Sequence, residues 1–464
     1  MKDEKESVKI GLEIHGYLVT KEKLFCRCPT NYKVAVPNTN ICPICTGQPG
    51  SKPMLPNAEA LRKVIAISLM LGCRINSKVI WQRKHYDWPD LPKGYQDTIS
   101  GAYSIPVAEK GEFLGIKISE AHLEEDPARW DPVTGKVDYN RCGMPLIEIV
   151  TEPEFKNSKE VHEWLNQLLL MLDYIKAVDS DAGIKADINV SIAVEGKRGD
   201  RIEIKNLNSM AAIEKAINYE ILRQTDLMKK GGKVKKETRA FNELENVTIV
   251  MRAKEEAEDY RFIPDPDLPI VEISNKETEE IKSTLPELPH LKVKRLMKEY
   301  NLSKYTAGVL SSDLEIANFF EKIAEKVKDV NLVSRWVTIE LLRVLNWNKK
   351  KLSEVRIKLE HFVELLELIE KGKLTELGAK RILNEFIPRS FFPSAQIKKV
   401  EKIEDKAEIE KLCKEVIAKN KSAVEDYKKG EQKALNFLIG QVVVLSGRRA
   451  DSQIAKEVML KLLR

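Results

Sequence analysis

Four of the chain's seven cysteines lie in one short segment, as the pairs Cys26-Arg-Cys28 and Cys42-Pro-Ile-Cys45. Zn²⁺ prefers four soft ligands in a tetrahedron, and two closely spaced thiol pairs joined by a short loop supply such a set. In a reducing cytosol this clustering favours a metal over disulfides. Four thiolates leave no open coordination position, so we expect a structural zinc site at residues 26–45. The alternative is a loop with four free thiols.

A second group of chemically active side chains combines carboxylates with histidines. Glu13 and His15 share one face of a predicted strand, and Glu148 interrupts an otherwise apolar run. The segment 121–126 places three acidic residues beside His122. Carboxylates from several strands, with one imidazole, suit Mg²⁺ whose shell is completed by phosphate oxygens. Alternatively, Glu148 pairs with an Arg or Lys across the sheet and residues 124–126 form a solvated turn, but together the acids favour a metal site.

Basic and aromatic residues are interleaved in the stretch RKHYDWP at residues 83–89, and Arg252 and Arg261 flank a later run of mixed charge. Such stretches hold phosphates or stack bases, although each alone also fits an ordinary surface loop. The sequence contains neither GxxxxGK[ST] nor GxGxxG, and no GxSxG elbow or Gly/Ser-rich amidase run. The residues alone therefore indicate a Mg²⁺–phosphate site without a standard phosphate loop.

Composition limits the class of protein. The chain has 464 residues, 43% of them hydrophobic, and 77 Lys and Arg against 71 Asp and Glu give a formal charge of +6. These values exclude wholesale disorder and a histone-like polycation, so any nucleic-acid binding must come from local patches. The charged start MKDEKESVK lacks the apolar core of a signal peptide, and no apolar run approaches the roughly 18 residues of a membrane span. We therefore expect a cytoplasmic protein.

The elements that must position these side chains are strands in the first part of the chain and helices in the second. Period-two alternation predicts strands at 8–15, 185–192 and 201–205. A helix is predicted at 58–71, with Asn57 as its N-cap and Gly72 at its end. A second helix is predicted to begin at Asn157, where Glu160 completes a capping box. After Leu285 the period is helical. The prediction is an α+β fold, with an antiparallel sheet in residues 1–284, an all-α region at 285–400 and a small helical tail domain at 401–464.

Long runs of the chain resemble the GatB family, the B subunits of the aminoacyl-tRNA amidotransferases. The runs are GLEIH (11–15), PNTNICPICTGQPG (37–50), YDWPDLPKGYQ (86–96), HLEED (122–126), GMPLIEIVTEP (143–153), KNLNSM (205–210), ETRAFNE (237–243), MRAKEEAEDYRFIPDPDLP (251–269) and GEQKALNFLIGQV (430–442). The resemblance covers essentially the whole chain. Residues 97 and 98 depart from many bacterial relatives, and many relatives lack the four cysteines, so zinc would belong to a subset.

The resemblance implies a cradle domain that activates a misacylated tRNA. With the γ-phosphate of ATP the enzyme would phosphorylate the side-chain carboxylate of Glu or Asp carried by tRNA(Gln) or tRNA(Asn). Ammonia from a partner amidase, the A subunit, would then displace phosphate and leave an amide. With a small C subunit the chain would form a heterotrimer, and its tail helices would bind the tRNA body. Phosphoryl transfer needs positioning and charge neutralisation more than covalent chemistry, which agrees with an acid cluster that lacks a nucleophile.

Specific residues follow from the resemblance. Mg²⁺ would be held by Glu13, His15, Glu125 and Glu148, with the choice between Glu124 and Glu125 open. ATP phosphates or the tRNA end would meet Lys205, Arg252 and Arg261. The four cysteines would hold structural Zn²⁺. Two other readings stay open: a non-catalytic zinc-knuckle RNA-binding protein, and a free-standing ATP-dependent carboxylate–amine ligase. The preference between Asp-tRNA and Glu-tRNA is not readable from the sequence.

Overall fold

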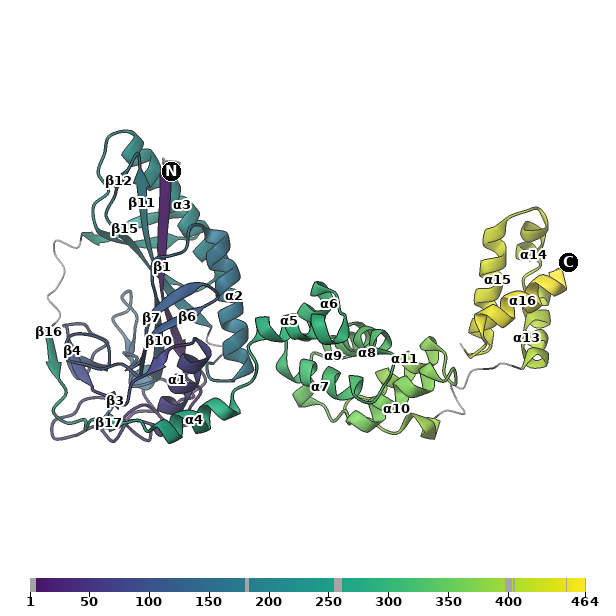
Figure 1. The fold of residues 1–464 in the computed structure, drawn as a ribbon, viewed down its shortest axis with the longest axis horizontal. Coiled ribbons are helices and arrows are strands. Elements are labelled where there is room, and N and C mark those ends of the chain that lie inside the picture. The colour runs from purple at the N-terminus through teal and green to yellow at the C-terminus, as the bar shows by residue number, and fades with distance from the viewer. Residues whose placement is uncertain are drawn as a thin grey trace. The chain divides into compact units, whose positions relative to one another are not determined.

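The computed structural model describes residues 6–179, 183–253, 261–396, 403, 405–447 and 449–463, and the side chains of residues 206, 252 and 253 lie outside this described part. The chain forms two compact units, Met1–Leu288 and Pro289–Arg464, and Figure 1 labels many of their helices and strands. Across the described ranges, no helix combines the length and the apolar character that crossing a membrane requires.

The first unit is built around one large sheet. In the described residues its strand order is β15-β14-β13-β11-β1-β10-β7-β5-β4-β16. The bounds of these strands are β1 (Glu6–Tyr17), β4 (Gln82–His85), β5 (Tyr95–Thr98), β7 (Ile116–Glu125), β10 (Pro145–Thr151), β11 (Ile184–Val194), β13 (Ile202–Leu207), β14 (Glu237–Asn242), β15 (Val247–Ala253) and β16 (Arg261–Pro264). Shorter elements of the unit are β2 (Arg74–Ile75), β3 (Lys78–Val79), β6 (Ala108–Phe113), β8 (Arg129–Trp130), β9 (Val137–Asp138), the 3₁₀ turn η1 (Tyr139–Arg141), β12 (Lys197–Arg198), β17 (Val271–Glu272) and the helix α4 (Asn275–Thr284).

The sheet is mixed, which corrects the prediction of an antiparallel sheet. β13 pairs with β14 in parallel, with Ile202 opposite Glu237, whereas the central pairs of β1 with β10 and β11 are antiparallel. The reason lies in the connection, because parallel neighbours need a crossover and α3 (Met210–Lys229) provides it between β13 and β14. The helix was not assigned from sequence, so the direction of β14 was missed.

Helices cover the apolar face of the sheet, and polar side chains lie on the opposite face. Ile10, Leu12 and Ile14 of β1 are buried in the core, as their alternation predicts. That core also contains residues of α1 (Ala58–Met70), α2 (Ser158–Tyr174) and α3, and Figure 1 shows α2 and α3 along the same side of the sheet. The alternate residues of β1, Glu13 and His15 among them, face the other side.

Both predicted helix starts are confirmed. The side chain of Asn57 accepts hydrogen bonds from the backbone of the first turn of α1, and Gly72, at φ +69°, follows the end of that helix. At α2 the side chain of Asn157 accepts from the Glu160 N–H at 2.9 Å, and the Glu160 carboxylate in turn accepts from the Lys156 N–H at 2.9 Å. These caps satisfy backbone donors that would otherwise lack partners.

The second unit is helical and has two separate hydrophobic cores, one formed by residues between Leu296 and Phe386 and one by residues between Ile403 and Leu463. Elements of the first core region are α5 (Pro289–Tyr300), α6 (Lys304–Leu310), α7 (Leu314–Ala324), α8 (Val330–Arg335), the π-helical turn η3 (Trp336–Leu341), α9 (Leu342–Trp347), η4 (Leu352–Glu354), α10 (Leu359–Glu370), α11 (Glu376–Asn384) and η5 (Pro393–Gln396). The second region contains α13 (Lys406–Lys419), α14 (Lys421–Lys428), α15 (Gln432–Leu445) and α16 (Ser452–Leu463). The division between the compact units falls at Leu288, and the predicted boundaries at 284/285 and 400/401 stay predictions.

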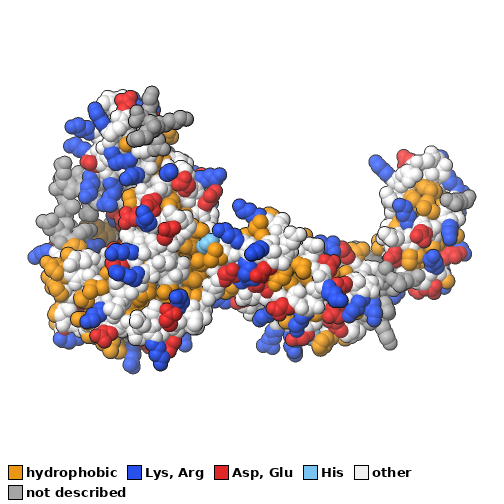
Figure 2. Space-filling model, in the orientation of Figure 1, with side chains coloured by type: hydrophobic (Ala, Val, Ile, Leu, Met, Phe, Trp, Pro, Cys, Tyr) orange, Lys and Arg blue, Asp and Glu red, His pale blue; other side chains and the backbone are white. Residues whose placement is uncertain are grey.

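The surface carries both signs of charge. Figure 2 shows Lys and Arg side chains interspersed with Asp and Glu over the visible face of each unit. This agrees with a net charge of only +6 on 464 residues. Neither positive nor negative charge dominates the visible face, so surface charge alone does not mark a functional site there.

Candidate functional site

The polar face of the sheet brings together side chains that are far apart in sequence. β1 pairs with β10 so that His15 lies opposite Glu148, and β1 pairs with β11 so that Glu13 lies opposite Asp187. Residues directly opposite in antiparallel strands point to the same face. The register therefore collects acids from both neighbours of β1 around Glu13 and His15.

The first group consists of His15, Glu124 and Glu148, each of which offers a ligand atom within 4.8 Å of the other two. The Nε2 atom of His15 lies 3.4 Å from Oε2 of Glu148, and the same oxygen lies 2.9 Å from Nε2 of His122. His122 is 1% exposed. The apolar strand around Glu148 thus pairs its carboxylate with two imidazoles, and not with the Arg or Lys of the alternative interpretation.

Glu124, not Glu125, lies with His15 and Glu148. β10 pairs with β7 so that Glu148 is opposite His122, and Glu124 follows His122 by two residues on the same face. Glu125 points to the other face, where it forms an ion pair with Lys93 and accepts a hydrogen bond from the Asp97 N–H at 3.0 Å. The expectation that Glu125 lies with His15 and Glu148 is therefore corrected, and residues 124–126 are buried instead of forming a solvated turn.

The electrostatics of the first group are set by burial and by the two imidazoles beside Glu148. Burial opposes the charge on Glu148, but attraction to His122 and hydrogen bonds from His122 and His15 hold its pKa well below the usual range. Burial also disfavours the imidazolium of His15, yet its hydrogen bond and attraction to Glu148 raise its pKa to about 9. Burial and repulsion from Glu148 raise the pKa of Glu124. A cation beside Glu124 and Glu148 would relieve that repulsion.

A second acid group lies next to the first and consists of Glu13, Asp187 and Glu203, again with ligand atoms within 4.8 Å of one another. The Nζ atom of Lys205 lies 3.0 Å from Asp187 Oδ2 and 2.9 Å from Glu203 Oε1. Asn189 donates to Glu13 Oε1 at 2.9 Å. Burial and repulsion from Glu148 raise the pKa of Glu13, which shows that the two groups sense each other's charge. Lys205, a predicted contact, thus lies on this face, and Asp187 and Glu203 are functional candidates that the sequence interpretation missed.

The other two predicted phosphate contacts are Arg261 and Arg252. Arg261 lies opposite His85 in the pairing of β16 with β4, so it is on the face of the sheet opposite that of Lys84. Lys84 lies opposite Gln96, and its attraction opposes the rise in the pKa of Glu124. The backbone of Arg252 lies in β15, but its side chain belongs to the part of the chain that is not described. Lys84 is therefore the cation of the 83–89 stretch that shares the face of the acids.

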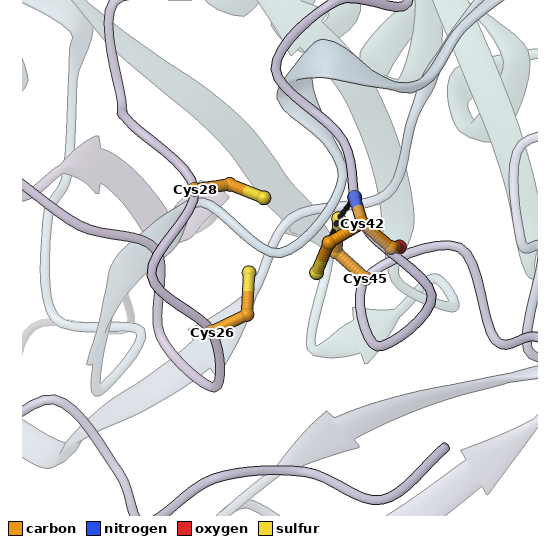
Figure 3. Close-up of side chains that lie close together, drawn as sticks. All are labelled: Cys26, Cys28, Cys42 and Cys45. Atoms are coloured by element: carbon orange, nitrogen blue, oxygen red, sulfur yellow. Dashed lines mark hydrogen bonds between the residues drawn. The ribbon is translucent and has the colours of Figure 1, made fainter. Parts of the chain in front are cut away.

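The four cysteines converge as predicted. Their Sγ atoms lie within 4.8 Å of one another, and Figure 3 shows the two pairs turned toward a common centre. The one-residue spacing of the first pair fits a tight turn in which the Lys23 N–H donates to Cys28 O at 3.0 Å. The second pair is closed by the Cys42 N–H, which donates to Cys45 Sγ at 3.3 Å. Four convergent sulfurs are a donor set that fits zinc.

The sulfur most prepared to bind a metal is that of Cys45. A hydrogen bond from the Cys26 thiol lowers its pKa, burial opposes this, and the Lys23 ammonium adds to it, which together bring the pKa of Cys45 to about 5. A thiolate is the form that coordinates metals. Cys45 is therefore disposed to act as a thiolate ligand, in a cluster whose geometry also fits a metal ion.

Comparison with known proteins assigns the chain to a family. The model for the GatB/GatE catalytic domain matches residues 8–279, and the model for the GatB domain matches residues 318–463. Among curated relatives, proteins named as the B subunit of aspartyl/glutamyl-tRNA(Asn/Gln) amidotransferase share 44% identity over 98% of both chains in Methanococcus maripaludis (strain C6) and 45% over 98% of both chains in Methanopyrus kandleri. The protein of that name from Methanothermobacter thermautotrophicus is 45% identical over 97% of this chain and 99% of its own. Both halves of the sequence resemblance are thus confirmed, and the chain belongs to the GatB family.

Proposed function

We propose that this chain is the activating subunit of a tRNA-dependent amidotransferase that converts Glu-tRNA(Gln), Asp-tRNA(Asn) or both to the amidated forms. The observation that carries the proposal is the union of family membership over nearly the whole chain with two acid groups on the polar face of one sheet. The relatives' name supplies the substrates, and the acids supply a site for nucleotide-bound cations.

The chemistry asks for charge neutralisation. The side-chain carboxylate of the esterified Glu or Asp attacks the γ-phosphorus of ATP, the bond to the bridging oxygen breaks, and ADP leaves. Ammonia then attacks the acyl carbon, the bond to the phosphate oxygen breaks, and the departing phosphate or water takes the proton released from nitrogen. Every participant in the first step is an anion, so cations held by the protein are what the step needs most.

In this proposal Glu124 and Glu148 would hold Mg²⁺, with His15 as a further ligand once its ring has lost its proton, and the ion would neutralise charge on the transferring phosphoryl group. The fit rests on the donor set, two carboxylates and one imidazole with ligand atoms within 4.8 Å. His122 acts behind them, because its ring, 2.9 Å from Glu148 Oε2, orients that carboxylate. Glu125 has no part in this set, since its carboxylate is engaged by Lys93 on the other face.

The second acid group, Glu13, Asp187 and Glu203, is assigned to a further cation that approaches with the phosphates. Lys205 already neutralises two of its carboxylates, and its side chain is 32% exposed, so it is accessible to a phosphate oxygen. Lys84 is the corresponding cation beside Glu124. Arg261 stays a candidate for the tRNA end on the opposite face of β16, and Arg252 stays a candidate from sequence alone.

The proposal includes Zn²⁺ at Cys26, Cys28, Cys42 and Cys45 in a structural role, because four sulfurs leave no position for a substrate. Partners are an amidase A subunit that supplies ammonia and a small C subunit, together with the misacylated tRNA. Arg449, Lys456 and Lys461 of the tail are candidate contacts to the tRNA backbone, and Arg448 lies outside the described residues.

The test is to compare Glu148→Gln with wild type in the complex reconstituted with its partners. We expect Glu148→Gln to abolish ATP-dependent conversion of misacylated tRNA while filter-binding affinity for tRNA stays within about twofold. Glu272→Gln, at an exposed strand position of β17 in a separate two-stranded sheet, is the matched control and should stay active. Loss of tRNA binding with intact ATP chemistry would favour the RNA-binding module, and amidation of free Glu or Asp without tRNA would favour the small-molecule ligase.

A further inference from the structure

Lys23 is a cation enclosed next to the cysteine cluster. Its side chain is among the largest fully buried ones, and the residue as a whole is 1% exposed. Its Nζ atom lies 2.8 Å from Asn40 O, 3.4 Å from Tyr139 O and 3.6 Å from Cys45 Sγ. An ammonium group has three donors and no acceptor, so these three acceptors match its hydrogen-bonding capacity.

A buried ammonium also needs an opposite charge, since leaving a charge unpaired in the interior is very costly. Within the described residues, no Asp or Glu lies within ion-pair distance of Lys23 Nζ. Glu125 approaches Gly143, as Lys23 does, but the carboxylate of Glu125 is already paired with Lys93. The anion that Lys23 faces is therefore sulfur, through Cys45.

The four-cysteine site, once it holds a metal, carries excess negative charge that a nearby cation would offset. Four thiolates around one divalent ion leave a net charge of about minus two. Cys26 and Cys45 are 5% and 4% exposed. A positive charge within the same enclosure offsets part of that excess, and hydrogen bonds to sulfur withdraw electron density from it.

We propose that Lys23 is the counter-charge of the four-cysteine site, and that it sets the affinity of the site for Zn²⁺ while linking the site to the loop before β10. This inference rests on the zinc site proposed above. The link follows from the Tyr139 carbonyl, which Lys23 contacts together with the cysteine loop, and from Leu24, whose N–H donates to Gly143 O at 2.9 Å. Lys23 is thus a positioning residue that acts through the cluster, not a zinc ligand.

The first experiment measures zinc affinity in the full-length chain by competition with a chelator. We expect Lys23→Met to bind Zn²⁺ about 10- to 100-fold more weakly than wild type, the range found when partners behind metal ligands are removed. Lys23→Arg, which keeps the charge, should recover most of the affinity. The matched control is Lys33→Met, which removes a lysine from the loop between the two cysteine pairs; Lys33 is partly exposed and pairs with Asp179 at 3.0 Å, so zinc affinity should stay within about twofold. Unchanged affinity in Lys23→Met would overturn the proposal.

A spectroscopic signature separates this role from general packing. With Co²⁺ in place of zinc, Lys23→Met should shift the sulfur-to-metal charge-transfer band to lower energy, because the sulfur loses a hydrogen bond and an adjacent positive charge. Lys33→Met should leave the band where it is. A band that does not move in Lys23→Met would show that Lys23 does not act on the sulfurs.

A double-mutant cycle covers the case in which Lys23→Met folds poorly. Cys45→Ser removes the anion that Lys23 faces, so adding Lys23→Met to Cys45→Ser should raise the melting temperature, whereas the same change in wild type lowers it. The pairing would be refuted if Lys23→Met changed the melting temperature equally in wild type and in Cys45→Ser. It would also be refuted if Lys23→Met prevented folding in both backgrounds. A wild-type chain that binds no zinc would refute the zinc site and the affinity claim together, and the cycle then still decides whether Lys23 and Cys45 are coupled.

Discussion

Replacing Glu124 and Glu125 by Gln, one at a time, tests the site assignment at neighbouring positions of one strand. Glu124 faces His15 and Glu148, and Glu125 faces Lys93. The same chemical change should therefore have different consequences at the two positions, one for Mg²⁺ and one for stability.

For Glu124→Gln the expected loss is in cation binding. An interaction with a charged group contributes about 1.5–3 kcal/mol, which corresponds to roughly 10- to 150-fold in affinity. Folding should be preserved, because burial and repulsion from Glu148 already raise the pKa of Glu124 and a neutral amide avoids both costs. We expect the half-saturating Mg²⁺ for tRNA-dependent ATP consumption to rise by about this factor, with an unchanged or higher melting temperature in the absence of Mg²⁺.

For Glu125→Gln the expected loss is in stability. Removing one partner of a buried ion pair costs about 3–5 kcal/mol, but Lys93 keeps Asp97 at 2.7 Å. Burial and repulsion from Glu125 raise the pKa of Asp97, so Asp97 ionises more readily once Glu125 is gone and limits the loss to about 2 kcal/mol. At roughly 2–4 °C per kcal/mol, the melting temperature should fall by about 4–8 °C.

The two variants are compared by thermal unfolding and by Mg²⁺ titration of the reconstituted complex. Wild type and Glu272→Gln serve as references for both readouts. A rise in half-saturating Mg²⁺ for Glu125→Gln but not for Glu124→Gln would refute the assignment of the cation site to the face of His15. Equal destabilisation by both changes would refute the reasoning from the Lys93 pair.

Three further changes have outcomes that the structure predicts. Lys205→Met removes the ammonium group that pairs with Asp187 and Glu203, so tRNA-dependent ATP consumption should fall about 10- to 100-fold. The melting temperature of this variant should depend more steeply on Mg²⁺ concentration than that of wild type. The same Mg²⁺ dependence in variant and wild type would contradict the role of Lys205. Cys42→Ser should lower bound zinc to less than half of the wild-type content by elemental analysis after dialysis, and full retention would exclude a four-sulfur site. Burial opposes the charge on Glu220, but hydrogen bonds from Arg223 and Thr248 hold its pKa below the usual value. The ionised Glu220 therefore stabilises the fold at pH values above its unfolded pKa, near 4.3. This stabilisation is lost as pH falls through the lower pKa of the folded state. Urea unfolding should therefore show that Glu220→Gln costs about 2–3 kcal/mol at pH 7 and less at pH 3, and a cost that does not change with pH would argue against this linkage.

The strongest local patterns were readable from residue types and their spacing. The alternation of Ile10, Leu12 and Ile14 predicted which face of β1 is buried, and therefore that Glu13 and His15 point the other way. The helix starts at Asn57 and Asn157 followed from capping chemistry, because those hydrogen bonds form within four residues. The convergence of the cysteines was predicted from the two closely spaced thiol pairs, because such pairs are typical of a tetrahedral zinc site.

The choice between Glu124 and Glu125 was also present in the sequence, although it was left open. Leu123 is buried in the core, so His122 and Glu124 must share the opposite face and Glu125 must share the face of Leu123. The signal is the single apolar residue within HLEED. Three acids in a row obscured it, because each is as plausible a ligand as the next when the phase of the strand is not considered.

What the sequence by itself determined is the chemistry available on each segment: which side chains share a strand face, which sulfurs can meet and where helices begin. Only the tertiary structure decided which segments become neighbours. It placed β11 on one side of β1 and β10 on the other, which brought Asp187 and Glu203 to Glu13, and it enclosed Lys23 against Cys45. The physical reason is that the periodicity of a strand is a local property, whereas its partner and register depend on burying apolar faces contributed by segments more than a hundred residues apart.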